Sequence, residues 1–316
     1  MLPTAEDAKI AFVFPGQGTQ YVGMGKALYE ASQAARRIFA QADETLGFAL
    51  SRLCFEGPED ELHDTINAQP AILTVSIACL AALRERSGEL GRKLSPVAVA
   101  GHSLGEYTAL VAAGVLDFPD ALRLVRERGR LMKESGEQQP GGMVAIVGLT
   151  AEQADAICVE ARALGTIVRA NTNSPDQLVL SGELAALDRA TQLAREAGAR
   201  AVVPLRITIA SHSPLMQNAA LKLAEILASI PLREPQVPIA ANITGQLLTT
   251  AEEVRRELAE QLTGPVEWTR SVAQMVENGV NTFIEIGPGQ VLSRLIKRIS
   301  RDVQATSLDD GAIAAL

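Results

Sequence analysis

A glycine-flanked serine, Ser103, constrains the fold of this chain more than any other feature of the sequence. It lies in the pentapeptide GHSLG at residues 101–105, between a short apolar run at 97–100 and a segment at 104–115 that is apolar on nearly all sides. A G-x-S-x-G sequence between a buried strand and a helix is typical of a nucleophile elbow, where the glycines let neighbouring backbone approach and the helix N-terminus stabilises negative charge. We therefore predict that Ser103 is a catalytic nucleophile. The alternative is a turn in which Ser103 only caps the helix.

The order of apolar patterns along the chain indicates an α/β fold built from two units. Buried strands are expected at residues 10–14, 97–100 and 282–286, and helical patterns at 24–46, 70–86, 104–115 and 213–230. Strands that alternate with helices favour a mostly parallel sheet covered on both faces. Residues 142–205 instead follow the order β-α-β-β-α-β of a ferredoxin-like unit. We predict a large α/β subdomain at residues 1–138 and 207–316, with a small ferredoxin-like subdomain inserted at 139–206.

Composition and charge narrow the class of protein. With 316 residues, 47% of them apolar, the chain is long enough for two domains and a core. The net charge of −8 and the 3% of aromatic residues argue against nucleic-acid or anionic-membrane binding. The three cysteines lie far apart without metal-ligand spacing, so we expect neither a disulfide nor a metal site. Residues 1–9 lack the apolar stretch of a signal peptide, and no run approaches the ~18 apolar residues of a membrane span, so a soluble cytoplasmic protein is predicted.

A serine nucleophile needs a base, and the chain has only three histidines. His102 is adjacent to Ser103, so its side chain is expected to point elsewhere, and His63 lies in the charged stretch ELHD, where a solvent-facing side chain is expected. His212 follows a predicted apolar strand and precedes an amphipathic helix, and catalytic groups in α/β folds gather at such strand ends. Elimination makes His212 the predicted base, with a helix-capping or core histidine as the alternative. The group that orients its imidazole cannot be chosen from 37 carboxylates or from the backbone carbonyls.

One arginine, Arg128, is predicted to face the core. On a helical wheel of residues 121–132 it falls within the apolar arc, whereas the other charged residues of this segment lie on the opposite face. A guanidinium that enters a core is costly unless an anion meets it. Two hypotheses follow. Arg128 snorkels or pairs with an internal carboxylate, or it binds a substrate carboxylate through two parallel hydrogen bonds.

Two further features have weaker implications. The glycines of residues 16–25 resemble a phosphate-binding loop, but their spacing is not that of a dinucleotide site, and their alternative use is to present backbone N–H groups near the elbow. The last helix is basic in an acidic protein, with Arg294, Lys297, Arg298 and Arg301. Such a stripe is usually a solvated face, and the docking of an acidic partner is the alternative.

Together these motifs resemble those of the malonyl-CoA:acyl carrier protein transacylases, and of the acyltransferase domains of polyketide and fatty-acid synthases. The resemblance runs in the family's order over nearly the whole chain. It rests on FPGQGTQ at 14–20, GHSLGE at 101–106, RGRLM at 128–132, Ser211-His212, Gln261-Leu262 before PVEW at 265–268, and EIGPG at 285–289. It implies an α/β-hydrolase-like large subdomain with a parallel sheet and an inserted ferredoxin-like small one.

The resemblance also implies roles for individual residues. Ser103 would attack the malonyl thioester, and His212 would take the serine proton. The backbone carbonyl of Gln261 would orient His212, so that no aspartate is needed. The backbone N–H groups of Gln17 and Leu104 would form the oxyanion hole. No permanently bound cofactor is implied, because malonyl-CoA is a substrate and phosphopantetheine is carried by the partner protein.

The expected function is therefore the transfer of a malonyl group from malonyl-CoA to the phosphopantetheine thiol of an acyl carrier protein, for fatty-acid or polyketide synthesis. Arg128 would hold the malonyl carboxylate, in agreement with the helical wheel, and the carrier, which is typically acidic, would dock on the basic last helix of a monomeric enzyme. One alternative is an acyl-hydrolase or esterase on the same scaffold, which would have no use for a buried cation. Another is a non-catalytic carrier-docking module, against which the intact Ser103 and His212 weigh.

Overall fold

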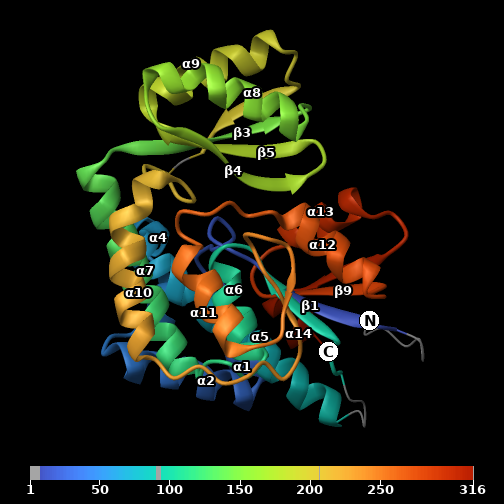
Figure 1. Cartoon of the computed structure of the whole chain (residues 1–316). Helices are drawn as coiled ribbons and strands as arrows, with labels where there is room; N and C mark the ends of the chain where they lie inside the picture. The colour runs from blue at the N-terminus through green and yellow to red at the C-terminus, as the bar shows by residue number, and fades with distance from the viewer. Residues whose placement is uncertain (1–7, 90–93, 206, 316) are drawn as a thin grey trace.

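The described residues, 8–89, 94–205 and 207–315 of a computed structural model, form two β-sheets (Figure 1). The predicted absence of a signal peptide concerns residues 1–7, and the predicted subdomain limits include Arg206 and Leu316, all of which lie outside the described residues. The larger sheet contains β1 (Ile10–Phe14), β2 (Ala98–Gly101), β7 (Ile239–Ala240), β8 (Leu247–Leu248), β9 (Thr282–Ile286) and β10 (Gln304–Leu308). Their order across the sheet is β10-β9-β1-β2-β7-β8.

The larger sheet is parallel from β10 to β7, as the sequence predicts, and β8 runs antiparallel to β7. Every residue of β1, β2 and β9 is buried, which explains why these strands are continuous apolar runs rather than alternating patterns. β1 and β2 end side by side, with Phe14 paired to Gly101. The loop that follows β1 therefore lies next to the glycine-flanked serine.

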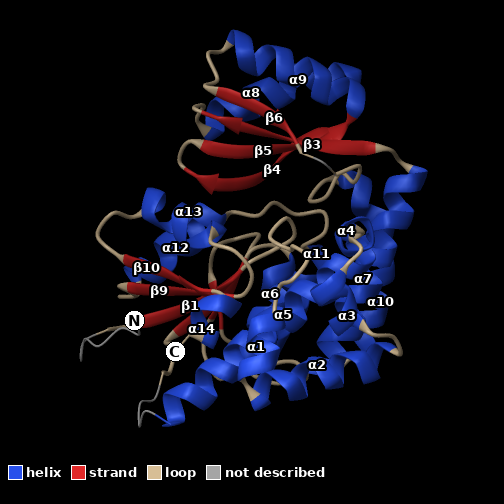
Figure 2. Ribbon diagram, turned by 180° about the vertical axis from the view of Figure 1, so that it is seen from behind, coloured by secondary structure: helices blue, strands red, loops and turns tan. Residues whose placement is uncertain are grey.

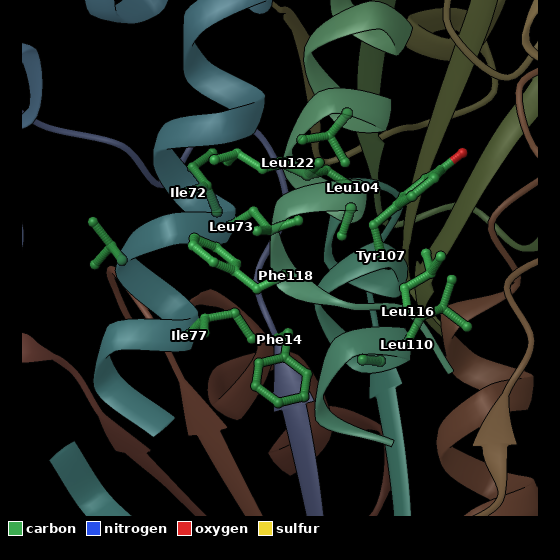
Figure 3. Packing of buried hydrophobic residues seen from close by; sticks show 14 of the residues in the cluster. Phe14, Ile72, Leu73, Ile77, Leu104, Tyr107, Leu110, Leu116, Phe118 and Leu122 are labelled. Carbon is green, nitrogen blue, oxygen red and sulfur yellow. The ribbon is translucent and has the colours of Figure 1, made fainter. Parts of the chain in front are cut away.

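Helices cover both faces of the larger sheet (Figure 2): α5 (Thr65–Glu89) and α6 (Leu104–Ala112) lie on one face, and α12 (Trp268–Glu277) and α13 (Val291–Ile299) on the other. The larger unit also contains α1 (Lys26–Ala31), α2 (Gln33–Leu46), α3 (Leu50–Glu56), α4 (Glu59–His63), α7 (Phe118–Gln138), α10 (Gln217–Ser229), α11 (Ala251–Glu260) and α14 (Asp310–Ala314), with a 3-10 turn, η2 (Pro214–Met216), before α10. Phe12 and Phe14 pack into the core formed with α5 and α6, whereas Ala11 and Val13 pack into the core formed with α12 and α13. Figure 3 shows the first of these cores, with side chains of α5, α6 and β1 turned toward one another.

Two predicted helices differ from the structure in their bounds. The pattern at 24–46 is two helices, because Ser32 is extended between α1 and α2 and its hydroxyl accepts a hydrogen bond from the Ala35 N–H. The helix predicted at 70–86 is α5, which begins at Thr65. Pro70 therefore lies inside this helix and does not mark its start. Burial of α5 in the core outweighs the local cost of the proline.

The prediction that no segment approaches a membrane span needs correction for α5. This helix is long and apolar enough to cross a membrane by length and composition, with a mean hydropathy of 1.7 over its most apolar window. However, 83% of that window is buried inside the protein, so α5 is a core helix. The apolar pattern predicts a start at Pro70, five residues after the observed start at Thr65, and so underestimates the length of α5.

Three strands, β7, β8 and β10, are missing from the sequence prediction. β7 and β8 have two residues each, too few for any periodicity to show. β10 lies at the edge of the sheet and has the sequence QATSL, in which exposed polar residues separate the buried ones. Short or polar strands of this kind are defined by their neighbours more than by their own sequence.

The smaller sheet contains β3 (Gly141–Val147), β4 (Ile167–Ser174), β5 (Gln177–Glu183) and β6 (Ala201–Pro204), with helices α8 (Ala151–Ala161) and α9 (Leu184–Glu196) and a 3-10 turn, η1 (Arg162–Leu164). Its strands are antiparallel in the order β4-β5-β3-β6, and the chain order β3-α8-β4-β5-α9-β6 confirms the predicted ferredoxin-like unit. Helices α8 and α9 cover the face that is turned away from the larger unit (Figure 1). The exact limits of this subdomain, 139–206, remain a prediction.

A glycine in α7 sets how closely α7 packs against α5. A Cβ atom on Gly129 would lie 2.6 Å from the carbonyl oxygen of Thr65 and 3.0 Å from the Cα of Ile66. These are backbone atoms, which cannot move aside independently, so the approach requires glycine. Arg128, next to Gly129, consequently lies deep between the helices.

Candidate active site

The elbow at Ser103 is a strained turn between β2 and α6. Ser103 has φ 51° and ψ −107°, and His212 has φ 58°; no other described residue except glycine has a positive φ. Such conformations cost roughly 1–3 kcal/mol each and persist where the surrounding contacts impose them. A Cβ atom on Gly101 would lie 1.9 Å from the backbone of Gly105, and one on Gly105 would lie 2.1 Å from the carbonyl oxygen of Phe14. Both glycines of the motif are therefore required by the close approach of backbone.

The structure brings His212 to Ser103, although residues 207–211 before it form a loop and not the predicted strand. The Oγ of Ser103 lies 2.8 Å from the Nε2 of His212, which is only 3% exposed. The Nδ1 of His212 faces the backbone oxygens of Gln261 at 2.9 Å and Gly264 at 3.1 Å. Because both are acceptors, Nδ1 carries the proton, and Nε2 is left to accept the serine O–H. The Ser103 side chain makes no capping hydrogen bond, so the alternative of a purely capping serine does not hold.

The other two histidines lie elsewhere, as expected. The Nε2 of His102 lies 2.8 Å from the Oδ1 of Asn173, and its ring packs 5.8 Å from that of Trp268. His63 is exposed at the end of α4, and its Nδ1 lies 2.8 Å from the Glu59 carbonyl oxygen. Neither ring is hydrogen-bonded to Ser103, so His212 is the histidine that the structure places to serve as the predicted base.

Gln17 and Leu104, the predicted oxyanion-hole residues, both line the cavity beside Ser103. Leu104 is the first residue of α6, where backbone N–H groups have no partner within the helix. The loop that carries Gln17 touches the elbow, because a Cβ atom on Gly16 would lie 2.4 Å from the carbonyl oxygen of His102. The fold thus gathers both residues at the nucleophile, and their use as an oxyanion hole remains a prediction.

Arg128 is 1% exposed, as the helical wheel predicts, and its guanidinium is directed at the nucleophile. Its Nη1 donates to the Oε1 of Gln69 at 2.8 Å, and its Nη2 donates to the Oε1 of Gln261 at 3.1 Å and to the Oγ of Ser103 at 3.2 Å. In the described part of the chain no carboxylate lies within ion-pair distance of Arg128, and its Nε has no hydrogen-bond partner. The hypothesis of an internal ion pair therefore fails, and Arg128 is a buried cation with neutral partners.

The same cation acts on the base. The pKa of His212 is lowered from 6.5 to about 3, first because burial penalises the charged imidazolium and second because of the positive charge of Arg128. The hydrogen bonds to the carbonyl oxygens of Gln261 and Gly264 oppose this shift. His212 is therefore neutral, and able to accept a proton, throughout the physiological pH range.

Two residues that were not predicted to belong to the site, Asn242 and Glu106, hold the elbow and Gln261 through hydrogen bonds. Asn242, which follows β7, accepts the Ser103 N–H on Oδ1 at 2.7 Å and donates from Nδ2 to the Gly101 carbonyl oxygen at 2.7 Å. Glu106 accepts the Asn242 N–H at 3.0 Å and the Nε2 of Gln261 at 2.5 Å. The available signal was a polar residue at the end of, or within, an otherwise apolar segment, as at Asn242 after β7 and Glu106 in α6.

A cavity of about 510 Å³ opens in front of Ser103 and is lined by both units of the fold. The smaller unit contributes Asn171 and Asn173 of β4 and Val179 of β5. α13 contributes Val291, Leu292 and Leu295, while its basic residues Arg294, Lys297 and Arg298, and Arg301 beyond it, are exposed. Within the described ranges, no group of three or more His, Cys, Asp or Glu side chains is arranged to hold a metal ion.

A serine on a strained elbow, hydrogen-bonded to a neutral histidine, can form an ester with an acyl group and then release it to a second acceptor. A Ser-His pair of this kind at the end of a strand in a parallel sheet defines a class of protein: the enzymes that transfer an acyl group through a serine ester. Within that class the chain belongs to the acyl transferase family, because the family model described as "Acyl transferase domain" matches residues 11–312.

Named relatives agree with this assignment. The chain is 45% identical over 304 residues to the malonyl CoA-acyl carrier protein transacylase of Bacillus subtilis, with 96% of this chain and 94% of the relative covered. The solved structure of an acyl carrier protein S-malonyltransferase from Vibrio cholerae has a TM-score of 0.91 at 40% identity and covers 98% of this chain and 99% of its own. A malonyl-transacylase solved in complex with a type II PKS acyl-carrier protein has a TM-score of 0.92 at 42% identity, with 98% of both chains covered. These matches confirm the family and the fold class predicted from the sequence.

The effect of Arg128 on His212 leads to a prediction about pH. In Arg128→Ala the lost positive charge should raise the pKa of His212 above about 3, but it should stay below 6.5 because burial remains the larger cause. Since only neutral His212 can accept the serine proton, the acid limb of Ser103 acylation by acetyl-CoA should move to higher pH. An NMR titration of the imidazole in the two proteins measures the shift directly.

The exposed Arg123→Ala variant on the same helix serves as control and should titrate like the wild type. An unchanged or lowered His212 pKa in Arg128→Ala would contradict the coupling.

Proposed function

We propose that this chain transfers a malonyl group from malonyl-CoA to the phosphopantetheine thiol of an acyl carrier protein, through a malonyl ester of Ser103. The observation that carries the proposal is Arg128, a fully buried cation that has no carboxylate partner among the described residues. Its Nη2 lies 3.2 Å from the Oγ of Ser103. A substrate with a free carboxylate next to its thioester supplies the missing anion at that place. The naming of the relatives as malonyl transacylases supports the same substrate.

In the first half-reaction, His212 takes the proton of Ser103 on Nε2 while Oγ attacks the thioester carbonyl. The backbone N–H groups of Gln17 and Leu104 receive the developing oxyanion, and the imidazolium then returns the proton to the departing thiol of coenzyme A. The hydrogen bond from Nδ1 to the Gln261 carbonyl keeps the imidazole in the tautomer that this exchange needs. The product is a malonyl ester on Ser103.

In the second half-reaction, the carrier's thiol occupies the position that coenzyme A left. His212 takes the thiol proton, the sulfur attacks the ester carbonyl, and the same N–H groups hold the oxyanion until Ser103 leaves with the proton. The chain itself supplies every group in this scheme, so no resident cofactor is required. A pathway in fatty-acid or polyketide synthesis, a cytoplasmic location and a monomeric state remain predictions.

The alternative, an acyl-hydrolase on this scaffold, is less well supported. A hydrolase of neutral acyl groups gains nothing from a buried guanidinium at the nucleophile, yet it would bear the cost of desolvating that cation. A non-catalytic docking module is disfavoured because Ser103 and His212 keep a hydrogen-bonded geometry in strained backbone conformations.

Replacement of Arg128 distinguishes these functions. Removing one partner of a desolvated, charge-assisted pair typically costs about 2 to 5 kcal/mol, or roughly 30- to several-thousand-fold. Arg128→Ala should lower kcat/KM for malonyl-CoA by that order, and kcat/KM for acetyl-CoA should stay equal or rise, because acetyl has no carboxylate. Arg128→Lys keeps the charge but not the planar fork and should lie in between.

The measurement compares kcat/KM for the two donors together with the melting temperature, and Arg123→Ala is again the matched control. An equal fall for both donors with a lowered melting temperature would mean that Arg128 only supports the core.

We also propose that the carrier docks on the exposed basic face of α13, defined by Arg294, Lys297, Arg298 and Arg301. The position of α13 supports the proposal, because its apolar residues line the cavity and Arg298 donates to the Oε1 of Gln177 on β5 at 3.1 Å. An acidic carrier would thus be held where its pantetheine arm can enter the cavity.

Charge reversal tests the docking face. The double variant Arg294→Glu/Lys297→Glu should raise KM for the carrier about tenfold or more and reduce the salt dependence of transfer, because rim charges act mainly on association. Acylation of Ser103 by malonyl-CoA should not change. Arg195→Glu, on the exposed side of α9 in the smaller unit, is the control. A carrier KM equal to that of the wild type would refute docking at α13.

A further inference from the structure

Glu106 is a buried acidic residue in the first turn of α6, 1% exposed, and the reaction scheme gives it no part. Its two carboxyl oxygens have different partners. One accepts the backbone N–H of Asn242 at 3.0 Å, and the other accepts the Nε2 of Gln261 at 2.5 Å. Glu106 thus presents two acceptors to two donors. Burial raises the pKa of Glu106, and the hydrogen bonds from Gln261 and Asn242 oppose that shift by stabilising the ionised form. A glutamine of the same shape cannot reproduce this arrangement, because one end of its amide is a donor.

The Gln261 amide is oriented by these contacts. Its Nε2 donates to Glu106 and to the carbonyl oxygen of Ser103 at 3.0 Å, while its Oε1 accepts the Nη2 of Arg128 at 3.1 Å. In the reversed orientation, Oε1 would face two acceptors and Nε2 would face the guanidinium donors. Glu106 therefore determines that an oxygen, rather than an NH₂ group, meets Arg128.

A second amide holds Arg128 from the other side. Gln69 accepts the Nη1 of Arg128 on Oε1 at 2.8 Å, and its Nε2 donates to the Oγ1 of Thr65 at 2.9 Å. The Thr65 hydroxyl gives its one proton to the Oε1 of Gln17 at 2.9 Å, so it must accept from Gln69. Arg128 is therefore held between two amide oxygens whose orientations are both fixed by further hydrogen bonds.

We propose that Glu106 is a positioning residue for acyl-group selectivity: by orienting the Gln261 amide, it holds the Arg128 guanidinium in place for a substrate carboxylate. The proposal rests on malonyl transfer as the function. Glu106 does not touch the substrate. It acts through Gln261 on Arg128, and its backbone partner Asn242 in turn holds the Ser103 N–H at 2.7 Å.

Glu106→Gln tests the proposal with a side chain of nearly the same shape. The new amide places an NH₂ group against either Asn242 or Gln261, and relief of the second clash turns the Gln261 amide so that its NH₂ faces Arg128. Loss of a satisfied buried hydrogen bond of this kind corresponds to about 10- to 100-fold. We expect kcat/KM for malonyl-CoA to fall by that factor and kcat/KM for acetyl-CoA to fall much less, so that the malonyl-to-acetyl ratio decreases.

Glu285→Gln is the matched control. Glu285, on β9, is also fully buried, and its two oxygens accept the backbone N–H groups of Leu292 at 3.0 Å and Ser293 at 2.8 Å. The same substitution at this position should leave the malonyl-to-acetyl ratio at the wild-type value. A ratio that falls equally in both variants would show a general effect of buried charge and would overturn the proposal.

A second variant keeps the test decisive if Glu106→Gln does not fold. Gln261→Leu removes the amide but keeps the backbone carbonyl that faces His212, and it should lower the same ratio. Where both single variants fold, the double variant should lose little more than either alone, because residues that act through one another are not additive. Strict additivity, or an unchanged ratio in Gln261→Leu, would refute the inference.

The wild type separates this inference from the function on which it rests. If wild-type protein shows no preference for malonyl-CoA over acetyl-CoA, the proposed function fails. If it prefers malonyl-CoA and Glu106→Gln keeps the full preference, only the role of Glu106 fails.

Discussion

Burying the Arg128 guanidinium removes it from water at a cost of several kcal/mol, and no described carboxylate offsets that cost by pairing with it. Three neutral oxygens take its place, from Gln69, Gln261 and Ser103. Much of the site's other geometry serves this arrangement. α7 approaches α5 through Gly129, and the two amides are locked by their own partners. Under the proposed function, this cation awaits the carboxylate of the substrate.

The same cation has a second consequence at the base. By lowering the pKa of His212, it keeps the imidazole neutral but also makes it a weak proton acceptor. A malonyl carboxylate that neutralises Arg128 would relieve part of this effect when the correct substrate binds. Selectivity for malonyl and activation of His212 would then arise from a single ion pair. The Ser103 Oγ and the His212 Nε2 lie 2.8 Å apart, and both residues have positive φ values.

Strong local patterns predicted much of this structure. The GHSLG motif indicated the elbow, because the required glycines and the flanking strand and helix are all local in the sequence. The position of Arg128 followed from helical periodicity. The ferredoxin-like order was legible because its strands are long enough to show a pattern.

What could not be predicted depends on contacts between distant segments. Asn242 follows a two-residue strand that has no signal of its own, and its hydrogen bond to Ser103 joins positions 139 residues apart. Glu106 belongs to the GHSLGE motif, but its partner Gln261 comes after the inserted unit in the sequence, 155 residues away. The orientation of an amide is a property of packing, which the sequence does not display. The backbone carbonyl that faces His212 was indicated only by the family resemblance, because the residues themselves left the partner of the imidazole open.

If Ser103 carries the malonyl group between the two thiols, the malonyl ester can be detected by intact-mass analysis after the protein is mixed with malonyl-CoA. Peptide mapping locates the group, and a carrier bearing phosphopantetheine is then added. We expect one added malonyl group, located on Ser103, absent in Ser103→Ala and discharged by the carrier. An adduct on Cys54, Cys79 or Cys158 that survives in Ser103→Ala, or the absence of any adduct while transfer proceeds, would contradict this expectation.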